Sequence, residues 1–254
     1  MNIFAVIGAH RKGNTYNYVK KLEESMKTIG DFNFDYLNLW EKQFETCRGC
    51  HLCLIRGIEK CPIKDEIIDI KEKIKRADSL ILASPVYVMN VTPLMKNFID
   101  RLSSVCHRPE FIKQNGLVLT TVGAYGSKKV LNYMENVLNV WGIQHVTKVD
   151  IQTPPVQNLP EKLQKNNKKQ IENKSAIYAK KLIKKNGLKP SFSSLMQFHV
   201  QRMIFSQKTS KKDMPEDYNF YSKLEGKKYY SDIKINFLKT IAAKSIAKIM
   251  GLFY

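Results

Sequence analysis

Strand-like and helix-like segments alternate along the first 150 residues, and this alternation limits the folds that the chain can adopt. Short apolar runs at Asn2–Gly8, Ser79–Ser84 and Gly116–Gly123 have the composition of strands that are buried on both faces. Two more strand patterns occur at Asp31–Leu39 and Gln144–Ile151. Strands joined through helices form right-handed crossovers and lie parallel. We therefore expect an α/β fold with a five-stranded parallel sheet, order 2-1-3-4-5, flanked by helices.

Helical periodicity fills the segments that connect these strands. The expected helices are Asn14–Ile29, Asp65–Arg76, Thr92–Val105, Ser127–Gly142 and Leu159–Asn186. In an open sheet of this kind the ligand binds beyond the carboxyl ends of the strands, near the point where the strand order reverses. The segments expected at that edge are Gly8–Thr15, Ser84–Asn90 and Thr121–Gly126.

The chain is longer than a minimal five-stranded fold needs. We expect the α/β domain to span residues 1–186 and a basic C-terminal helical extension to span residues 187–254. Two helices are predicted in the extension, near Ser191–Ser206 and Ile233–Met250, on either side of a tyrosine-rich polar stretch at Asp217–Ser231.

The net charge of +19 is concentrated in the second part of the chain. Residues 155–254 hold 21 Lys and Arg against 7 Asp and Glu, whereas residues 1–154 hold 21 against 16. Anionic lipid, nucleic acid or an acidic redox partner would each fit this charge, and so would lysine-rich helix faces exposed to solvent. No nucleic-acid recognition motif accompanies the charge, so we expect no nucleic-acid binding.

The segment Ile233–Tyr254 places lysines among apolar residues, a pattern typical of helices that lie on anionic membrane surfaces. The same pattern fits packing on the core or on another subunit, which we favour. Peripheral membrane contact is the alternative role of this helix.

The loop between the first strand and the first helix has the features of a phosphate site. A helix N-terminus offers unpaired N–H groups and a positive field. Around it lie His10, Arg11, Gly13, Asn14 and Thr15, which add charge, hydroxyl and amide donors and a small residue at the turn. The sequence is neither G-x-x-x-x-G-K-[ST] nor G-x-G-x-x-G, which disfavours P-loop NTPases and dinucleotide-binding folds. A plain turn with a helix cap is the alternative.

The loop GAHRKGNT, followed by a helix, resembles the G-[ST]-x-R-x-x-G-N-T loop of the NADPH-dependent FMN reductases. That family includes flavodoxin-like quinone reductases and iron–sulfur flavoproteins. The resemblance continues through ASPVY at 83–87, MKNFIDR at 95–101 and TVGAYG at 121–126, and covers roughly residues 1–185. It implies a flavodoxin-like fold that binds FMN. Because members of that family are commonly oligomers, it also implies a homo-oligomer, a dimer or a tetramer. Ala9-His10 departs from the family pattern and removes one hydroxyl donor, a role left for His10 or Thr15.

The resemblance also implies where the isoalloxazine ring lies. The residues it places around the ring are Pro85, Val86, Tyr87, Val88, Gly123 and Gly126. A flavin needs a flat apolar surface and backbone amides directed at its polar edge. We expect the amides of Val86, Tyr87 and Val88 to be free for this purpose. Asp100-Arg101 is interpreted as structural, and we assign no general acid or base.

Four cysteines lie close together in the polar stretch after the second strand. Their pattern is Cys47-x2-Cys50-x2-Cys53-x7-Cys61-Pro62, similar to the C-x2-C-x2-C run and terminal Cys-Pro of bacterial ferredoxins. It looks like the compact motif of the iron–sulfur flavoproteins, which implies a [4Fe-4S] cluster. Zinc bound by four thiolates, or by three with His51, is the main alternative, and metal-free thiols are another. Cys106 lies apart and is expected to be a buried apolar residue.

These features together predict an FMN-dependent oxidoreductase that moves electrons between a [4Fe-4S] cluster and FMN, with NAD(P)H or reduced ferredoxin as donor. Alternatives are an NAD(P)H-dependent FMN or quinone reductase without a cluster, and a non-enzymatic flavodoxin-like electron carrier. The N-terminal residues lack a basic region and a small-residue cleavage site, and no apolar run is long enough to span a bilayer. We therefore expect a cytoplasmic protein.

Overall fold

The chain forms one five-stranded parallel sheet in the computed structural model, which describes residues 1–42, 44–184, 189–232 and 235–250. The strands are β1 (Asn2–Ile7), β2 (Asn33–Asn38), β3 (Ser79–Pro85), β4 (Asn115–Val122) and β5 (Val146–Gln152). Their order is β2-β1-β3-β4-β5, which confirms the predicted topology. Ile7 pairs with Ala83, and Pro85 pairs with Thr121. The register therefore brings the ends of β1, β3 and β4 to one edge of the sheet.

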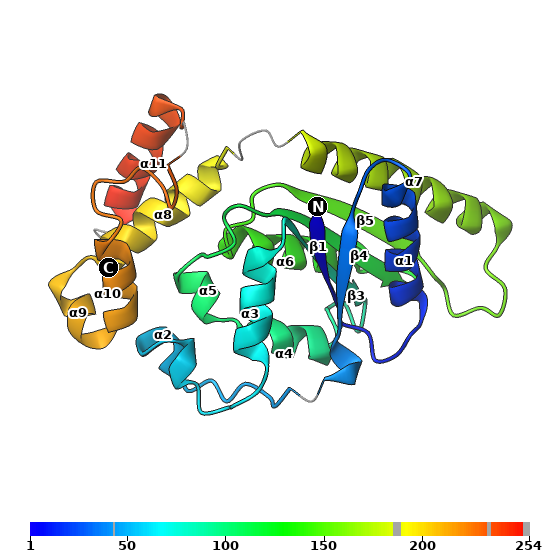
Figure 1. The fold of residues 1–254 in the computed structure, drawn as a ribbon, viewed down its shortest axis with the longest axis horizontal. Coiled ribbons are helices and arrows are strands. Elements are labelled where there is room, and N and C mark those ends of the chain that lie inside the picture. The colour runs from blue at the N-terminus through cyan, green and yellow to red at the C-terminus, as the bar shows by residue number, and fades with distance from the viewer. Residues whose placement is uncertain (43, 185–188, 233–234, 251–254) are drawn as a thin grey trace.

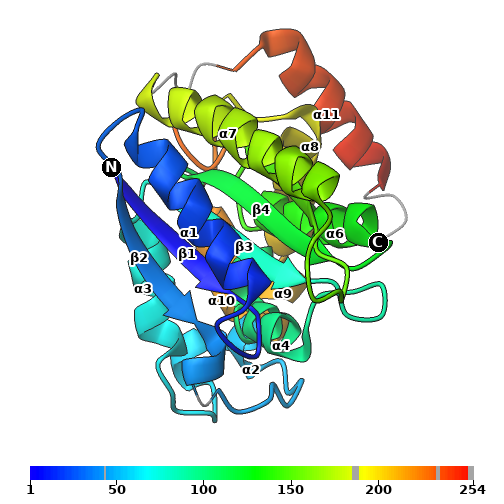
Figure 2. The ribbon, with the colours of Figure 1, turned by 90° about the vertical axis from the view of Figure 1, so that its right-hand side faces the viewer.

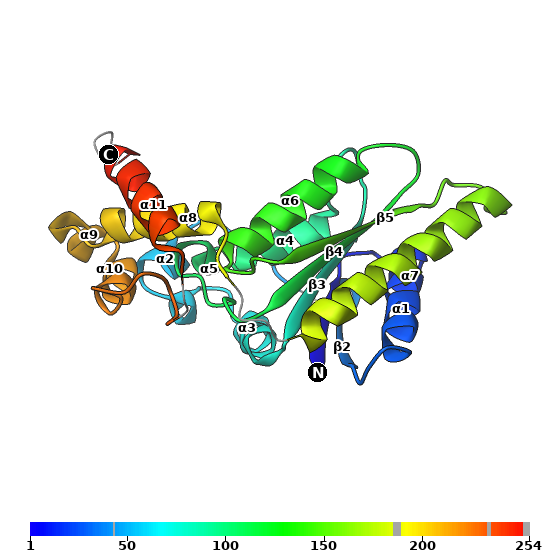
Figure 3. The same cartoon turned by 90° about the horizontal axis from the view of Figure 1, so that it is seen from above.

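Helices cover both faces of the sheet (Figure 3). One face is covered by α1 (Asn14–Lys27) and α7 (Glu161–Ile183), which lie side by side in Figure 2. The other face is covered by α3 (Ile67–Arg76), α4 (Pro93–Arg101) and α6 (Ser127–Val140). Side chains of the strands alternate between the two apolar cores, so that Ile3 and Ala5 face α1 and α7 while Phe4 and Val6 face the opposite layer.

Two connecting regions differ from the predicted elements. The helix expected at Thr92–Val105 is divided into α4 and the short α5 (Ser104–His107). The cysteine-bearing stretch is not a simple loop, because it contains three short helical turns, namely η1 (Leu39–Glu41), α2 (Leu52–Ile55) and η2 (Ile58–Lys60).

The C-terminal part is helical, as predicted, and lies beside α2 and α5 (Figure 1). Its described residues form four helices where two were expected, because the segment between the two predicted helices is itself partly helical. Its helices are α8 (Phe192–Phe205), α9 (Lys208–Asp213), α10 (Pro215–Ser222) and α11 (Phe237–Met250). The tyrosine-rich stretch, expected to be polar, contributes to a core. Tyr221 and Tyr229 are buried with Leu195 and Phe198 in a third apolar cluster. No helix among the described residues is long and apolar enough to cross a bilayer. The predicted domain boundary at 186/187 lies outside the described residues, as do residues 233–234 and 251–254 of the predicted last segment.

Candidate functional site

Three loops meet at the carboxyl edge of the sheet, and hydrogen bonds hold them together. The Gly8 amide donates to the Ala83 carbonyl oxygen at 2.8 Å, and the Thr92 hydroxyl donates to the Gly8 carbonyl oxygen. The Thr15 and Thr121 hydroxyls are 2.7 Å apart in a buried contact. The segments that follow β1, β3 and β4 therefore form one connected surface, as the parallel topology predicts.

The first loop leaves the N-terminus of α1 open to a ligand. Gly13 precedes the helix with no side-chain cap, and the first turn has no acidic residue. His10, Arg11 and Asn14 are exposed beside this positive helix end. Thr15 was expected to offer its hydroxyl to a phosphate. Instead its side chain is only 3% exposed, and its hydroxyl pairs with that of Thr121.

The structure does not show the close backbone turn that would explain a glycine at position 13. Its φ of −134° and ψ of −153° are those of an extended residue, and an added Cβ would meet only Arg11 Cγ, at 4.0 Å. A larger residue at position 13 could therefore adopt the same backbone conformation without a steric clash.

The second loop turns back on itself immediately after β3. The Tyr87 amide donates to the Asn90 carbonyl oxygen at 2.8 Å, and the Asn90 amide donates to the Tyr87 carbonyl oxygen at 3.0 Å. Between them Val88 and Met89 have φ values of 45° and 68°. A β-branched residue rarely adopts this left-handed conformation, and Val88 is 99% exposed, so no packing compensates for its strain.

The expectation of three free amides in this loop is wrong for two of them. The Val86 amide donates to the Thr121 carbonyl oxygen at 2.9 Å, and the Tyr87 amide closes the turn with Asn90. The Val88 amide has no protein acceptor among the described residues. Pro85 and Val86 are half-buried at the base of the turn, while Tyr87 is 45% exposed.

The third loop approaches the second at Gly126. Its φ is +99°, and an added Cβ would lie 3.0 Å from Met89 Sδ and 3.2 Å from Val86 Cγ1. Only glycine satisfies both the conformation and the contact. Gly123 is exposed, and a Cβ there would make an ordinary 3.6 Å contact with Pro155.

Side chains that sequence analysis did not single out complete this edge. Met89 in the second loop is 38% exposed, and Tyr125 in the third loop is 76% exposed. The His10 ring is parallel to the Tyr87 ring within 4°, with centroids 6.0 Å apart, which joins the first loop to the second. In the sequence, apolar residues in a loop that follows a strand are the pattern that could have indicated this ligand-binding surface.

The four clustered cysteines line one small cavity of about 40 Å³, together with Arg101 of α4. All five cysteines of the chain are free thiols. Cys50 is exposed, and Cys47, Cys53 and Cys61 are partly buried. Among the residues that the structure describes, no three His, Cys, Asp or Glu side chains are arranged to hold one metal ion.

Helix α4 anchors the chain that leads into this cysteine loop, defined here as residues 47–61. The Cys47 amide donates to Asn97 Oδ1 at 2.9 Å, and the Asn97 side chain donates to the Glu45 carbonyl oxygen at 3.2 Å. Arg101, whose side chain is 1% exposed, pairs with Asp65 and also donates to the Glu45 carbonyl oxygen.

Two opposing effects act on the Arg101 guanidinium. Burial alone would lower the pKa of Arg101, but the Asp65 carboxylate and the Cys61 thiol raise it above its usual value. A structural role was assigned to Arg101 from the sequence, and the buried ion pair with Asp65 agrees with that assignment. The Arg101 side chain also lines the cysteine cavity.

Comparison with known proteins agrees with the geometry. The family described as NADPH-dependent FMN reductase matches residues 1–154. An iron–sulfur flavoprotein of Archaeoglobus fulgidus is 34% identical over 146 residues, which cover 56% of this chain and 64% of that protein. An iron–sulfur flavoprotein of Clostridioides difficile is 32% identical over 169 residues, which cover 65% of this chain and 72% of that protein.

A solved structure resembles nearly the whole chain. The structure of RosB with a bound riboflavin-phosphate intermediate covers 93% of this chain and 92% of its own, with a TM-score of 0.54 and 15% identity. At this identity the likeness concerns the fold. The match over residues 1–154, together with the two relatives, shows that this chain belongs to the NADPH-dependent FMN reductase family.

Proposed function

We propose that this chain is an FMN-dependent oxidoreductase that binds FMN at the carboxyl edge of the sheet. The uncapped end of α1, with Arg11 and Asn14 exposed beside it, suits the phosphate because unpaired amides and positive charge stabilise an anion. The exposed surface formed by Tyr87 and Met89 suits the flat ring. Gly126 allows the Met89 side chain to pack closely against the third loop.

We propose that Cys47, Cys50, Cys53 and Cys61 hold a [4Fe-4S] cluster. Their common cavity supports this assignment, and so does the buried cation of Arg101 beside it, because the cluster and its four thiolates carry net negative charge. A single zinc ion would need sulfur atoms within about 4 Å of one another. The described residues hold no group of three or more such ligands arranged around one metal ion, so the [4Fe-4S] assignment rests on the cysteine spacing and on the relatives named iron–sulfur flavoproteins.

Helix α4 is the observation that carries the proposal, because it links the two sites directly. Its N-terminal cap, Thr92, donates to the Gly8 carbonyl oxygen in the phosphate loop. Further along the same nine-residue helix, Asn97 accepts a hydrogen bond from the Cys47 amide, and Arg101 donates to the Glu45 carbonyl oxygen. The chain can therefore hold two redox groups in fixed relation to each other.

When bound, FMN supplies both two-electron and one-electron exchange, and an iron–sulfur cluster supplies one-electron exchange. The chain binds the flavin phosphate, orients the ring between two loops and keeps the cysteine loop against α4. We propose NAD(P)H or reduced ferredoxin as the electron donor. No side chain among the described residues of this edge is assigned as a general acid or base.

Anaerobic purification followed by absorption spectroscopy and assays of iron, sulfide and zinc tests this proposal. We expect FMN together with iron and acid-labile sulfide, about four of each per chain. Stoichiometric zinc without sulfide would leave an NAD(P)H-dependent FMN or quinone reductase with a structural metal. Rapid NAD(P)H oxidation by the purified protein would separate an enzyme from a non-enzymatic electron carrier.

We further propose that residues 187–254 form a unit appended to an FMN-binding domain at residues 1–186, and that its helix α11 contacts an anionic membrane surface. Thr240, Ala243 and Ala247 pack α11 against α8, so the predicted packing role is met within the chain. The opposite face exposes Leu238, Ile241 and Ile249.

Charge is the reason to favour lipid over a second copy of the chain as the partner of this exposed face. Lys239, Lys244 and Lys248 flank it, and α11 has no acidic residue. Two such faces would repel each other across a symmetric contact, whereas lysines at the border of an apolar face attract anionic headgroups.

A further inference from the structure

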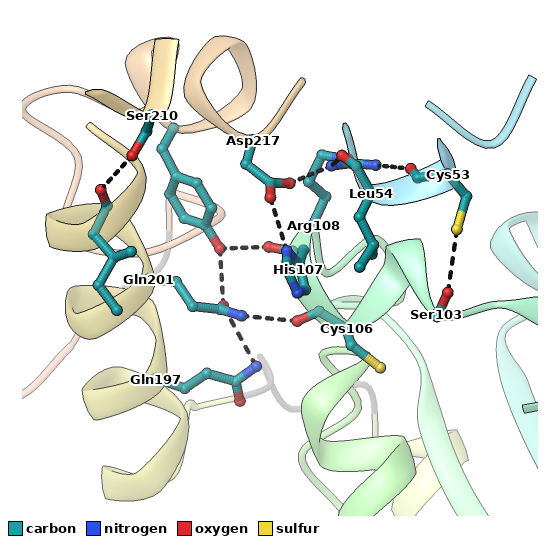
Figure 4. Close-up of polar contacts among 12 residues, drawn as sticks. Cys53, Leu54, Ser103, Cys106, His107, Arg108, Gln197, Gln201, Ser210 and Asp217 are labelled. Carbon is teal, nitrogen blue, oxygen red and sulfur yellow. Dashed lines mark hydrogen bonds and ion pairs between the residues drawn. The ribbon is translucent and has the colours of Figure 1, made fainter. Parts of the chain in front are cut away.

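A buried carboxylate links the C-terminal helices to the cysteine side of the molecule. Asp217 of α10 is 0% exposed, and its Oδ2 lies 2.7 Å from His107 Nδ1. Its Oδ1 accepts a hydrogen bond from Arg108. A buried charge is costly unless it is paired and hydrogen-bonded, so this carboxylate depends on both partners (Figure 4).

Arg108 carries the connection onward to the cysteine loop. Its guanidinium donates to the Leu54 carbonyl oxygen at 2.9 Å and to the Cys53 carbonyl oxygen at 2.7 Å. These carbonyl groups belong to the single-turn helix α2, whose last carbonyls have no partner within such a short helix. The fork of Arg108 thus binds a cysteine-bearing turn on one side and Asp217 on the other.

The chain before Arg108 is also held from the C-terminal side. Gln201 of α8 donates to the Cys106 carbonyl oxygen at 2.8 Å, and the buried Tyr221 of α10 donates to the His107 carbonyl oxygen at 2.8 Å. Tyr230 donates to Gln201 Oε1 at 2.9 Å. Two helices of the extension therefore fix the position from which Arg108 reaches α2.

We propose that Asp217 is a positioning residue for the cysteine loop, acting through Arg108. The C-terminal extension is then part of the cysteine site: it sets the direction of the Arg108 fork, and the fork fixes the backbone of Cys53. The cluster-related part of this proposal rests on the proposed function. The restraint on the loop itself does not, because it concerns contacts among the chain's own residues.

The physical expectation is a change in how easily the loop opens. Asp217→Asn removes the charge that orients Arg108, and a hydrogen bond to a charged group contributes about 1.5–3 kcal/mol, so opening of the turn at Cys53 should become roughly tenfold more frequent or more. The variant also leaves the Arg108 charge uncompensated. If a cluster is bound, that charge favours its reduced, more negative form and raises its potential.

The experiment compares the full-length protein, as purified anaerobically, with Asp217→Asn, Arg108→Lys and the control Tyr229→Phe. The control removes the 2.5 Å hydrogen bond between Tyr229 and Ser194. Tyr229 belongs to the same apolar cluster of the C-terminal helices as Tyr221, and it is far in sequence from the cysteines. The measurements are iodoacetamide labelling of Cys53, resolved by peptide mass spectrometry, the rate of iron loss to a chelator, and the reduction potential.

We expect faster Cys53 labelling and faster iron loss in Asp217→Asn and Arg108→Lys, and rates close to wild type in Tyr229→Phe. If Asp217→Asn does not fold, Arg108→Lys decides, because it keeps the charge but loses the fork. Unchanged Cys53 labelling in a folded variant overturns the positioning role. Absence of iron from the wild type overturns the cluster instead, and the labelling rates then still decide the role of Asp217.

Discussion

Thr15 and Thr121 are 106 residues apart in the sequence, yet their hydroxyl oxygens lie 2.7 Å apart in a buried contact. Thr15 belongs to the first turn of α1, and Thr121 lies near the end of β4. The contact fixes the first and third loops of the carboxyl edge relative to each other. The proposed phosphate and ring positions are therefore tied to each other through this contact.

The phosphate position can be tested with ligands that differ only in the phosphate. Arg11→Ala combined with Asn14→Ala should weaken FMN binding by about 1–3 kcal/mol for each side chain, because charged and neutral donors are lost. Riboflavin should be affected far less. Titration of the apoprotein with both flavins measures the difference, with Lys21→Ala on the same helix as control. Equal losses for both ligands would remove this loop from the site.

The two glycines of the third loop provide a matched pair. Gly126→Ala should cost about 1–2 kcal/mol of folding stability, because φ is +99° and the new Cβ would lie 3.0 Å from Met89 Sδ. It should also weaken flavin binding by moving the turn at Met89. Gly123→Ala meets only Pro155 at 3.6 Å and should leave folding stability nearly unchanged. Chemical denaturation and flavin titration of both variants test this, and similar losses of stability would contradict it.

The sheet could be predicted from the sequence because buried parallel strands are continuous apolar runs whose signal is local. The details of the ring loop could not. A tight turn of two left-handed residues is normally signalled by Asn or Gly, whereas here it is formed by Val88 and Met89. That turn uses the Tyr87 amide, and the Val86 amide donates to the Thr121 carbonyl oxygen, so the expectation of free amides failed for both.

The contact between Asp217 and Arg108 also could not be predicted from the sequence. The two residues are 109 positions apart, and each is one charge among many. Only the packing of α10 beside α2 and α5 brings them together. By contrast, the cysteine spacing carried its own local signal, and all four thiols line one cavity.

His199 of α8 predicts a pH effect on the C-terminal helices. Burial, together with the charges of Arg202 and Lys244, lowers the pKa of His199 from 6.5 to about 4. Between these values the unfolded chain binds a proton that the folded chain does not, so stability should fall as the pH drops from 6.5 towards 4. Amide hydrogen exchange in α8 and α11 measures this, and His199→Gln should reduce the pH dependence. An unchanged dependence in the variant would assign the effect to other groups.

The exposed face of α11 predicts binding to anionic vesicles. Leu238→Asp with Ile241→Asp should abolish co-sedimentation with phosphatidylserine vesicles and leave flavin absorbance intact, because both side chains are exposed. Binding by the wild type should weaken as salt is raised. If the wild type binds no vesicles and the double variant elutes at a smaller apparent mass, the face is instead a contact between copies of the chain.

The cysteine assignment predicts different results for the clustered and the separate thiols. Serine at Cys47, Cys50, Cys53 or Cys61 should lower the iron content and bleach the broad cluster absorbance, because each thiolate is one of four ligands. FMN should remain bound, since the phosphate and ring loops are formed by other segments. Cys106→Ser is the matched control, because Cys106 does not line the cavity and burial raises the pKa of its thiol, which disfavours the thiolate that a metal requires. Iron loss in Cys106→Ser equal to that in the four cluster variants would show that the loss reflects general destabilisation. Full iron content in any one of the four would exclude that cysteine as a ligand.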